Sequence, residues 1–406
     1  MERRVGVVGA TAIGAGSMLG AGVFVVWGPA AEAAGGLLVW AVLLAGVVAA
    51  LNAGSTAQLA AVHPVAGGAY SFGRAELGPW PGFVAGIGFV VGKTASIAAI
   101  ALAVGGYLVP DHAPAVATAA VVASWLLNSR GITRTAAASV VIASLVIGVL
   151  VAALFAATGA EGSATATFGW STAWDEARGL AQAAALVFFA FAGYARIATL
   201  GEEVREPSRT IPRAIGLALG IAAALYVALA VVLPRALGAD LADATAPVAD
   251  AVDGTWLPGA VVTAAAVAAA AGSLLALTAG VGRTAMAMAR EGDLPRALAR
   301  LNAREVPALA EGAACLAAIV LVWAGGLPFA IAMSSFAVLL YYAVANAAAH
   351  RAAGAGHVAG WRMPRALSAL GLVACVALMA SLPLAAVGAA AALLGVLMLG
   401  RIVARR

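Results

Sequence analysis

Glycines crowd one short stretch near the start of the chain, GAGSMLGAGVF at residues 14–24. The stretch lies in an apolar run long enough to span a bilayer, and it contains four glycines: Gly14, Gly16, Gly20 and Gly22. Glycine weakens a helix and lets a ligand approach the backbone closely. A spanning helix can unwind only where its freed N–H and C=O groups face protein or a cavity. We therefore predict a break at residues 16–22 that presents bare main-chain groups to a ligand. The alternative is a G-x-x-x-G packing face formed by Gly16 and Gly20.

A second break is predicted at residues 189–195, where the aromatic run FFAFAGYA contains a lone glycine. The half-helix that begins near Gly20 to Gly22 directs unpaired N–H groups and a positive dipole end outward, which suits a carboxylate. The carbonyls that end the first half-helix, and those near Phe189 to Ala192, suit an ammonium group. Because an α-amino acid carries both groups, the two breaks together predict an amino acid site.

Composition indicates a polytopic membrane protein. Of the 406 residues, 64% are hydrophobic and 10% are charged, whereas a soluble protein carries about 25% charged residues. Windows of about twenty residues predict twelve spanning helices in an all-α protein. Their ranges are 5–33, 34–61, 80–108, 113–129, 135–157, 178–200, 211–234, 258–289, 307–324, 327–349, 365–381 and 383–402.

The distribution of charge predicts the orientation in the membrane. With a cytoplasmic N-terminus, nineteen of the 23 basic residues fall on the cytoplasmic side, and the opposite side is rich in acids. We predict a cell-membrane protein with both termini in the cytoplasm, and attribute the net charge of +5 to this topology rather than to nucleic acid binding. A secretory signal at residues 1–29 is the alternative, but no convincing cleavage site follows the apolar run. The two cysteines lie in separate apolar runs and predict no disulfide framework.

The two predicted breaks lie five helices apart, with an odd number of crossings between them. Halves related in this way are inverted in the membrane, as in many secondary transporters. We predict a first five-helix repeat over residues 1–157, a second, inverted repeat over 175–350, and two further helices over 365–406.

Five segments carry a resemblance to a known family. They are GSMLGAGVF (16–24), HPVAGGAYSFGRAELGPWPGFVAG (63–86), NSRGI (128–132), FFAFAGYARIATLGEEVREPSRTIPRAI (188–215) and GRTAMAMAREGDLPRALARLNAREVP (282–307). In this order they resemble the amino acid–polyamine–organocation (APC) transporter superfamily, which has the leucine-transporter type of inverted five-helix repeat. The resemblance covers most of the chain through about residue 310.

The resemblance implies a set of substrate-binding residues around the two breaks: Ser17, Met18, Gly20, Ala21, Gly22, Phe189, Ala192 and Tyr194. The N–H groups of Ala21 and Gly22 would bind the carboxylate, and carbonyls from Met18 and the second break would bind the ammonium. Phe189 would occlude the substrate from outside, and Tyr194 would form a pocket wall. For both aromatic residues, ordinary helix packing is the alternative.

Other positions depart from the family pattern. Many proton-coupled or sodium-independent relatives carry a lysine in helix 5 in place of a sodium ion, but the predicted helix at 135–157 has no ionisable residue. Relatives usually carry a serine-arginine pair near the end of their eighth helix, and this pair reads Gly282-Arg283 in the predicted helix at 258–289. The acid that is common after the break in the sixth helix is replaced around Ala195-Arg196.

Lys93 lies in the middle of the predicted helix at 80–108, too deep to reach either interface easily. A charge there costs at least about 2.5–3.5 kcal/mol, so the side chain must face the bundle interior with a partner or a water path. We predict that Lys93 replaces the missing helix 5 lysine, either as a proton carrier or as a fixed charge in place of sodium. The alternative is a structural cation bonded to carbonyls at a helix break.

Arg196 lies about five residues from the cytoplasmic loop. It either snorkels to the interface or pairs with Glu202 or Glu203. The alternative is a gate contact that breaks as the site opens inward. The chain contains no H-E-x-x-H, G-x-S-x-G or P-loop pattern, so we predict no catalytic, metal or cofactor site.

Together these observations predict a secondary transporter of amino acids that works by alternating access in the lipid bilayer. Two cations and no acid in the predicted core favour neutral amino acids over arginine, lysine or polyamines. Proton coupling is favoured over sodium coupling. The alternatives are a transporter, exchanger or exporter of an amine or nucleobase on the same fold, and a non-transporting membrane scaffold or sensor. The substrate side chain, the direction of transport and the oligomeric state stay open.

Overall fold

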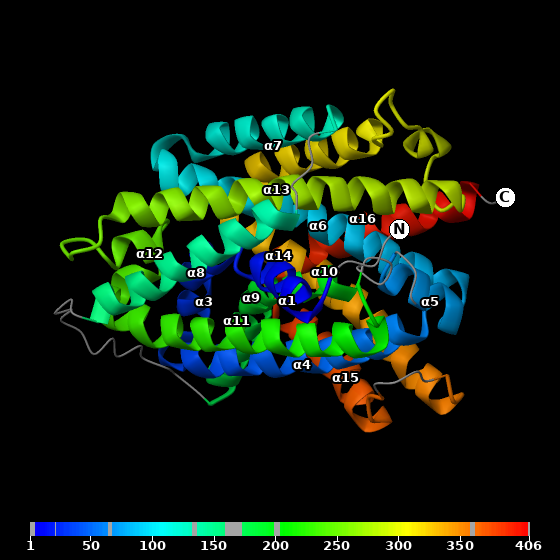
Figure 1. Cartoon of the computed structure of the whole chain (residues 1–406), viewed down its shortest axis with the longest axis horizontal. Coiled ribbons are helices and arrows are strands. Elements are labelled where there is room, and N and C mark those ends of the chain that lie inside the picture. Colours follow the sequence, from blue (N-terminus) through cyan, green and yellow to red (C-terminus); the bar gives the residue numbers. More distant parts are fainter. Residues whose placement is uncertain are drawn as a thin grey trace.

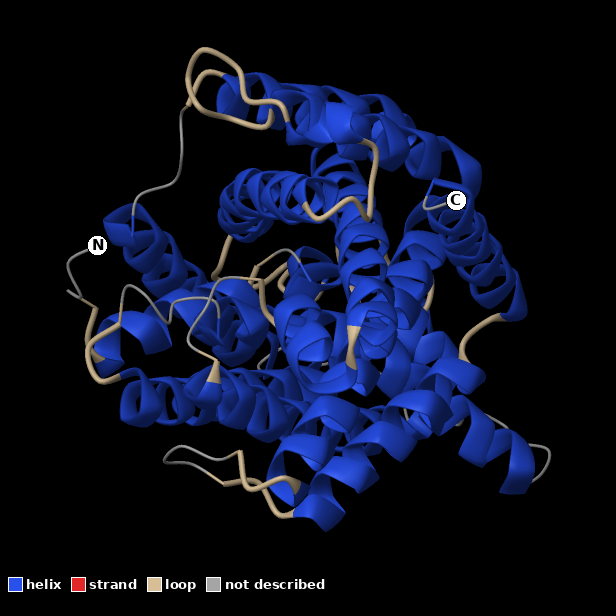
Figure 2. Cartoon of the chain, turned by 90° about the vertical axis from the view of Figure 1, so that its right-hand side faces the viewer, coloured by secondary structure: helices blue, strands red, loops and turns tan. Residues whose placement is uncertain are grey.

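The protein is all-helical over the residues that its structure, a computed structural model, describes. These residues are 5–20, 22–63, 67–131, 136–158, 173–198, 204–357 and 362–404. Within them, the one β interaction is an isolated bridge between Val5 and Val204. Figure 2, which looks along the long axis of the bundle, shows helices joined by loops. The predicted all-α class is therefore confirmed.

The helices follow one another through short connections. In the first part of the chain they are α1 (Val7–Met18), α2 (Gly22–Val25), α3 (Trp27–Ala34), η1 (Gly35–Leu37), α4 (Leu38–Val62), α5 (Ala69–Leu77), α6 (Pro79–Leu108), η2 (Pro110–His112), α7 (Ala113–Ser129) and α8 (Ala136–Thr158). In the second part they are α9 (Ala173–Phe191), η3 (Ala192–Tyr194), α10 (Ala195–Ala198), α11 (Pro207–Leu237), η4 (Gly238–Leu241), α12 (Pro247–Asp250), α13 (Gly259–Arg290), η5 (Arg296–Ala299), α14 (Ala308–Gly354), α15 (Arg365–Ser381) and α16 (Leu384–Ala404).

Length and hydropathy make most of these helices suitable for a membrane. Over the described ranges, nine helical segments are long and apolar enough to cross a bilayer: Val7–Val25, Trp27–Val62, Pro79–Leu108, Ser139–Thr158, Asp175–Ile197, Pro207–Leu241, Gly259–Arg290, Ala308–Gly354 and Leu384–Ile402. A helix satisfies its backbone groups internally, which hydrocarbon requires. The chain is therefore a multi-pass membrane protein, while the count of twelve crossings and the inverted repeat stay predictions.

Two glycines with positive φ divide long helical stretches at predicted boundaries. Gly35, with φ of 51°, separates α3 from the turn that leads into α4. Gly326, with φ of 69°, interrupts α14, and Pro328 follows within the same helix. Only glycine adopts this left-handed region without strain. The second division falls between the predicted ranges 307–324 and 327–349.

The long helices run along the long axis, as α4, α11 and α13 show in Figure 1. The short helix α12 lies at one end of this axis and α5 at the other, and we call these the α12 end and the α5 end. The broken segments α1 and α10 lie in the middle of the view. Glycines let α6 pack closely on α14, because a Cβ on Gly88 or Gly92 would meet Ala337 or Val338.

A buried ionic cluster at the α5 end connects α5, α6 and α16 with the loop that follows α13. Its centre is Asp293, which accepts hydrogen bonds from Arg74 on α5 at 2.9 Å and from the hydroxyl of Tyr70 at 3.0 Å. Arg401, near the end of α16, forms an ion pair with Asp293 at 2.8 Å. The Arg401 guanidinium also lies 4.5 Å from the ring centroid of Trp80 on α6. Burial, together with the Asp293 carboxylate, raises the pKa of the Tyr70 hydroxyl, so Tyr70 stays a donor.

Candidate substrate site

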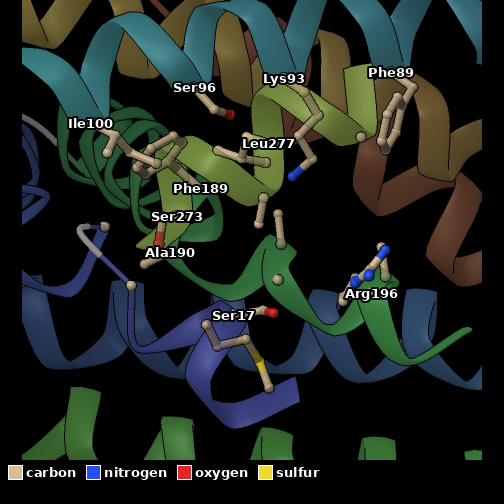
Figure 3. Close-up of a pocket in the computed structure, with 18 of the residues that line it drawn as sticks. Ser17, Phe89, Lys93, Ser96, Ile100, Phe189, Ala190, Arg196, Ser273 and Leu277 are labelled. Atoms are coloured by element: carbon tan, nitrogen blue, oxygen red, sulfur yellow. The ribbon is translucent and has the colours of Figure 1, made fainter. Parts of the chain in front are cut away.

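A cavity of about 360 Å³ lies where the two broken segments meet α6 and α13. Its lining comes from α1, α2, the end of α9, η3, α10, α6, α13 and α14. The volume falls within the range of small-molecule sites, roughly 300–1,000 Å³. Figure 3 shows Ser17 on one side of the cavity and Lys93, Ser96 and Ile100 of α6 on the other.

The first helix is interrupted where the glycines predict. Helix α1 ends at Met18, and the N–H of Leu19 closes the last turn on the carbonyl of Ala15 at 2.7 Å. Helix α2 then begins at Gly22. Met18, Gly20 and Gly22 line the cavity, whereas Ala21 lies outside the described residues, so its predicted N–H contact stays a prediction.

The second break is a short 3-10 turn between two helices rather than an open gap. Helix α9 continues through Phe191, tightens into the 3-10 turn η3 at Ala192–Tyr194, and resumes as α10 at Ala195. A 3-10 turn pairs each N–H with the carbonyl three residues back, which changes the pairing of the carbonyls at that point. Ala192 and Gly193 line the cavity.

Glycine allows the two breaks to touch each other. A Cβ on Gly193 would collide with the backbone of Ser17 and would stand 2.5 Å from the backbone nitrogen of Met18. A Cβ on Gly22 would approach the Cα of Ala190 at 3.1 Å. These glycines are needed for close approach between backbones.

The other glycines of the first break face other helices. A Cβ on Gly14 would meet Ile197 of α10, one on Gly16 would meet Ala143 of α8 at 2.9 Å, and one on Gly20 would meet Ser273 of α13. A single G-x-x-x-G face would direct its glycines at one partner helix. The spread over several partners explains why this stretch carries more glycines than one packing face requires.

Tyrosine hydroxyls hold the carbonyls that the breaks leave free. Tyr226 of α11 donates to the carbonyl of Met18 at 2.6 Å and approaches that of Ala190 at 3.2 Å. Tyr342 of α14 donates to the carbonyl of Ala192 at 3.4 Å. A carbonyl oxygen has two lone pairs, so each retains one that an ammonium could use.

The side chains predicted around the substrate separate into two groups. Ser17 lines the cavity, and its hydroxyl donates to the carbonyl of Ile13 at 2.8 Å. Phe189 also lines it, is 9% exposed, and lies near Ile100 in Figure 3. Tyr194 lies outside the lining: it is fully buried and stacks on Tyr342 with ring centroids 5.1 Å apart. For Tyr194 the structure thus shows the packing arrangement, because η3 rotates its side chain toward α14.

Three cationic side chains line the cavity, and none of its described lining residues is acidic. Lys93 is 9% exposed, and in Figure 3 its amine reaches from α6 into the space opposite the broken segments. Within the described part of the chain, Lys93 has no hydrogen bond or ion pair to a side chain. Arg196 of α10 and Arg283 of α13 are exposed and lie toward the α5 end. The proposed partners of Arg196, Glu202 and Glu203, lie outside the described residues.

Sequence reasoning missed several residues that the structure brings into or beside the site, among them Ser273, Tyr226 and Glu311. Ser273 lines the cavity next to Gly20, and Tyr226 binds the carbonyl of Met18 from α11. The expectation of a core without acids is wrong, because Glu311 of α14 is 1% exposed. The position of Glu311 inside the predicted helix at 307–324 was the sequence signal that could have revealed a buried acid. Glu311 is not among the lining residues of the cavity.

Comparisons with known proteins show which family and which relatives the chain is similar to. A family model described as "Amino acid permease" matches residues 9–404. The chain is 49% identical over 404 residues to a protein of Mycobacterium tuberculosis named an uncharacterized transporter, which covers 98% of this chain and 90% of that one. It is 26% identical over 331 residues to a branched-chain amino acid permease of Bacillus subtilis, covering 74% of this chain and 70% of the permease. It is 28% identical over 339 residues to a vacuolar cationic amino acid transporter of Arabidopsis thaliana. This match covers 76% of this chain and 53% of the plant transporter.

Proposed function

The chain belongs to the amino acid permease family of the APC superfamily, and from that premise we propose that it is a secondary transporter of neutral amino acids that works by alternating access. Family and relatives support amino acid transport and indicate a transporter rather than an enzyme. The neutral substrate class, transport that is proton-coupled or sodium-independent, and the alternating-access cycle are our proposal.

The helix count supports the proposed architecture. The nine long apolar segments become ten when Ala308–Gly354 is divided at Gly326, and α7 and α15, with 17 residues each, complete twelve. We propose repeats over 1–157 and 175–350 with helices 365–406 appended, both termini cytoplasmic, in the cell membrane. The ionic cluster at the α5 end would then lie on the cytoplasmic side.

The observation that carries the proposal is the contact between the two breaks at a cavity wall. Gly193 rests on the backbone of Ser17 and Met18, so the end of α1, the start of α2 and η3 meet at one place. The start of α2 would direct N–H groups at the substrate carboxylate, and the carbonyls near Met18 and Ala192 would take its ammonium. Phe189 would cover the substrate from the α12 end.

The charge of the lining supports a neutral substrate. With Lys93, Arg196 and Arg283 in the lining and no carboxylate among the described lining residues, these charges would repel a cationic substrate side chain. The lining without acids, rather than a core without acids, favours the neutral substrate, since the core contains the buried acid Glu311. The names of the relatives include both branched-chain and cationic substrates, and the charge of this chain's own lining supports the neutral class.

We assign Lys93 the role of a fixed charge in place of sodium, because its amine faces the cavity and has no carboxylate partner within the described ranges. Arg196, which also lines the cavity, would act as a gate residue with Glu202 or Glu203. Neither role requires a metal or a cofactor.

Counterflow in proteoliposomes tests the function. Vesicles loaded with one unlabelled amino acid should accumulate the same labelled amino acid when it is a substrate, with neutral amino acids exchanging and arginine and lysine not. Uptake at two pH values, with and without sodium, then tests coupling. Exchange of amines or nucleobases without any amino acid would favour the same-fold alternative and contradict the proposal.

A further inference from the structure

Glu311 is a buried acid that has no role in the transport cycle proposed above. It lies one turn into α14 and is 1% exposed. Its Oε2 atom is buried and has no hydrogen-bond partner among the described residues. A buried ionised carboxylate with an unsatisfied oxygen is costly, so such a group either holds a proton or takes up a partner.

The glycine of the Gly282-Arg283 pair makes room for this carboxyl group. A Cβ on Gly282 would collide with the Cγ of Glu311 and would stand 3.3 Å from its Oε1. A serine at this position, as in the family pattern, could not coexist with Glu311 in its present place. Gly282 on α13 and Glu311 on α14 therefore form one structural unit.

That unit lies directly beside the cavity lining. Gly280, Arg283 and Thr284 of α13 line the cavity, and Gly282 belongs to the same turn. Arg283 is the cation whose charge acts on Glu311, and Cys315 of α14 is the other titratable group that interacts with it. From α7, the uncharged ring of Trp125 packs against Gly312, next to Glu311. Arg283 thus connects a buried acid to the space where the substrate would sit.

We propose that Glu311 binds the proton that this transporter couples to amino acid uptake. The neutral carboxylic acid needs no ion pair at its buried position beside Gly282. When the Arg283 guanidinium turns from the cavity toward Glu311, the carboxylate becomes favourable and the proton passes to water at the α5 end, leaving a neutral pair. The inference rests on the proposed amino acid transport, and it places proton binding on Glu311 rather than on Lys93.

The decisive variant is Glu311→Gln, which keeps the shape of the side chain and removes its titration. We expect wild-type uptake to rise as the external pH falls, and the ratio of uptake at acidic to neutral pH to fall to about one in the variant, since a group that cannot titrate gives a flat profile. Counterflow, which needs no net proton movement, should stay within about twofold of wild type if the site itself is intact. Glu305→Gln, the same change at an exposed residue six positions earlier, should leave the pH profile unchanged.

Arg283→Met is the second variant, and it is decisive where Glu311→Gln does not fold. Without the guanidinium the acid stays protonated, so the pH profile should again be flat. The inference is overturned if either folded variant keeps the wild-type pH profile, if Glu311→Gln loses counterflow as well as uptake, or if wild-type uptake does not depend on pH. A wild-type protein without counterflow of any amino acid contradicts the proposed function instead, so the two failures are distinguishable.

Discussion

The hydroxyl of Tyr226 lies 2.6 Å from the carbonyl oxygen of Met18 and donates a hydrogen bond to it across more than two hundred residues of sequence. Met18 is the last residue of α1, so its carbonyl is one that the helix cannot satisfy. The same hydroxyl approaches the carbonyl of Ala190 at 3.2 Å. One fully buried side chain of α11 therefore holds both broken segments in the orientation that the cavity requires.

Tyr226→Phe removes this hydroxyl without changing the ring that packs on Trp27 and Phe191. We expect a loss of about 1–3 kcal/mol in stability, because a buried carbonyl loses its donor, together with weaker substrate binding. Thermal unfolding and the substrate concentration at half-maximal counterflow measure the two effects.

Tyr107→Phe is the matched control, since Tyr107 donates to the carbonyl of Phe24 at 2.9 Å, and Phe24, unlike Met18 and Ala190, does not line the cavity. It should reduce stability comparably and leave the half-maximal concentration within about twofold of wild type. Equal binding effects in the two variants would show that Tyr226 acts on stability alone.

Gly193→Ala should strongly reduce transport. The added methyl group would collide with the backbone of Ser17, and backbone atoms cannot move aside without shifting α1. We expect at least a tenfold loss of counterflow, about 1.4 kcal/mol or more at the transport barrier. Gly220→Ala on α11 is the control, because a Cβ there meets nothing within 4 Å, and alanine favours a helix interior. A Gly193→Ala protein that exchanges amino acids normally would contradict the contact between the breaks.

The parts of the fold that depend on local pattern were predictable. Apolar runs indicated a membrane protein of helices, and the glycines at 16–22 indicated the interruption between Met18 and Gly22. Lys93 was placed inside the bundle because a mid-helix charge has no other low-energy location, and the structure puts it at the cavity.

The parts that depend on contacts between distant helices were not predictable. No local signal shows that Tyr226 of α11 reaches Met18, or that Gly282 leaves space for Glu311. Tyr194 was expected at the pocket wall, but its direction depends on the 3-10 turn at Ala192–Tyr194, and a helical wheel cannot foresee that change of pitch.

Asp293→Ala tests the ionic cluster at the α5 end. The change leaves the Arg401 guanidinium buried without its carboxylate, and removing one partner of a buried pair typically costs about 3–5 kcal/mol. Unfolding in detergent should show a loss of this size. Glu291→Gln, which removes only the half-exposed partner of Arg74, should cost less than about 1 kcal/mol. If both variants lose the same amount of stability, the cluster does not stabilise the packing of α16 on α5 and α6.

Lys93→Met tests the fixed charge. Methionine keeps the length and apolar stem of lysine and removes the cation, so the cavity loses the charge that we assign in place of sodium. We expect uptake and counterflow both to fall at least tenfold, about 1.4 kcal/mol, whereas Lys93→Arg, which keeps the charge, should retain more activity than Lys93→Met. The residual uptake of Lys93→Met should still rise at acidic pH, because proton binding is assigned to Glu311. A flat pH profile in Lys93→Met beside a normal one in Glu311→Gln would reverse the two assignments. Full activity of Lys93→Met would show that the cation serves packing rather than transport.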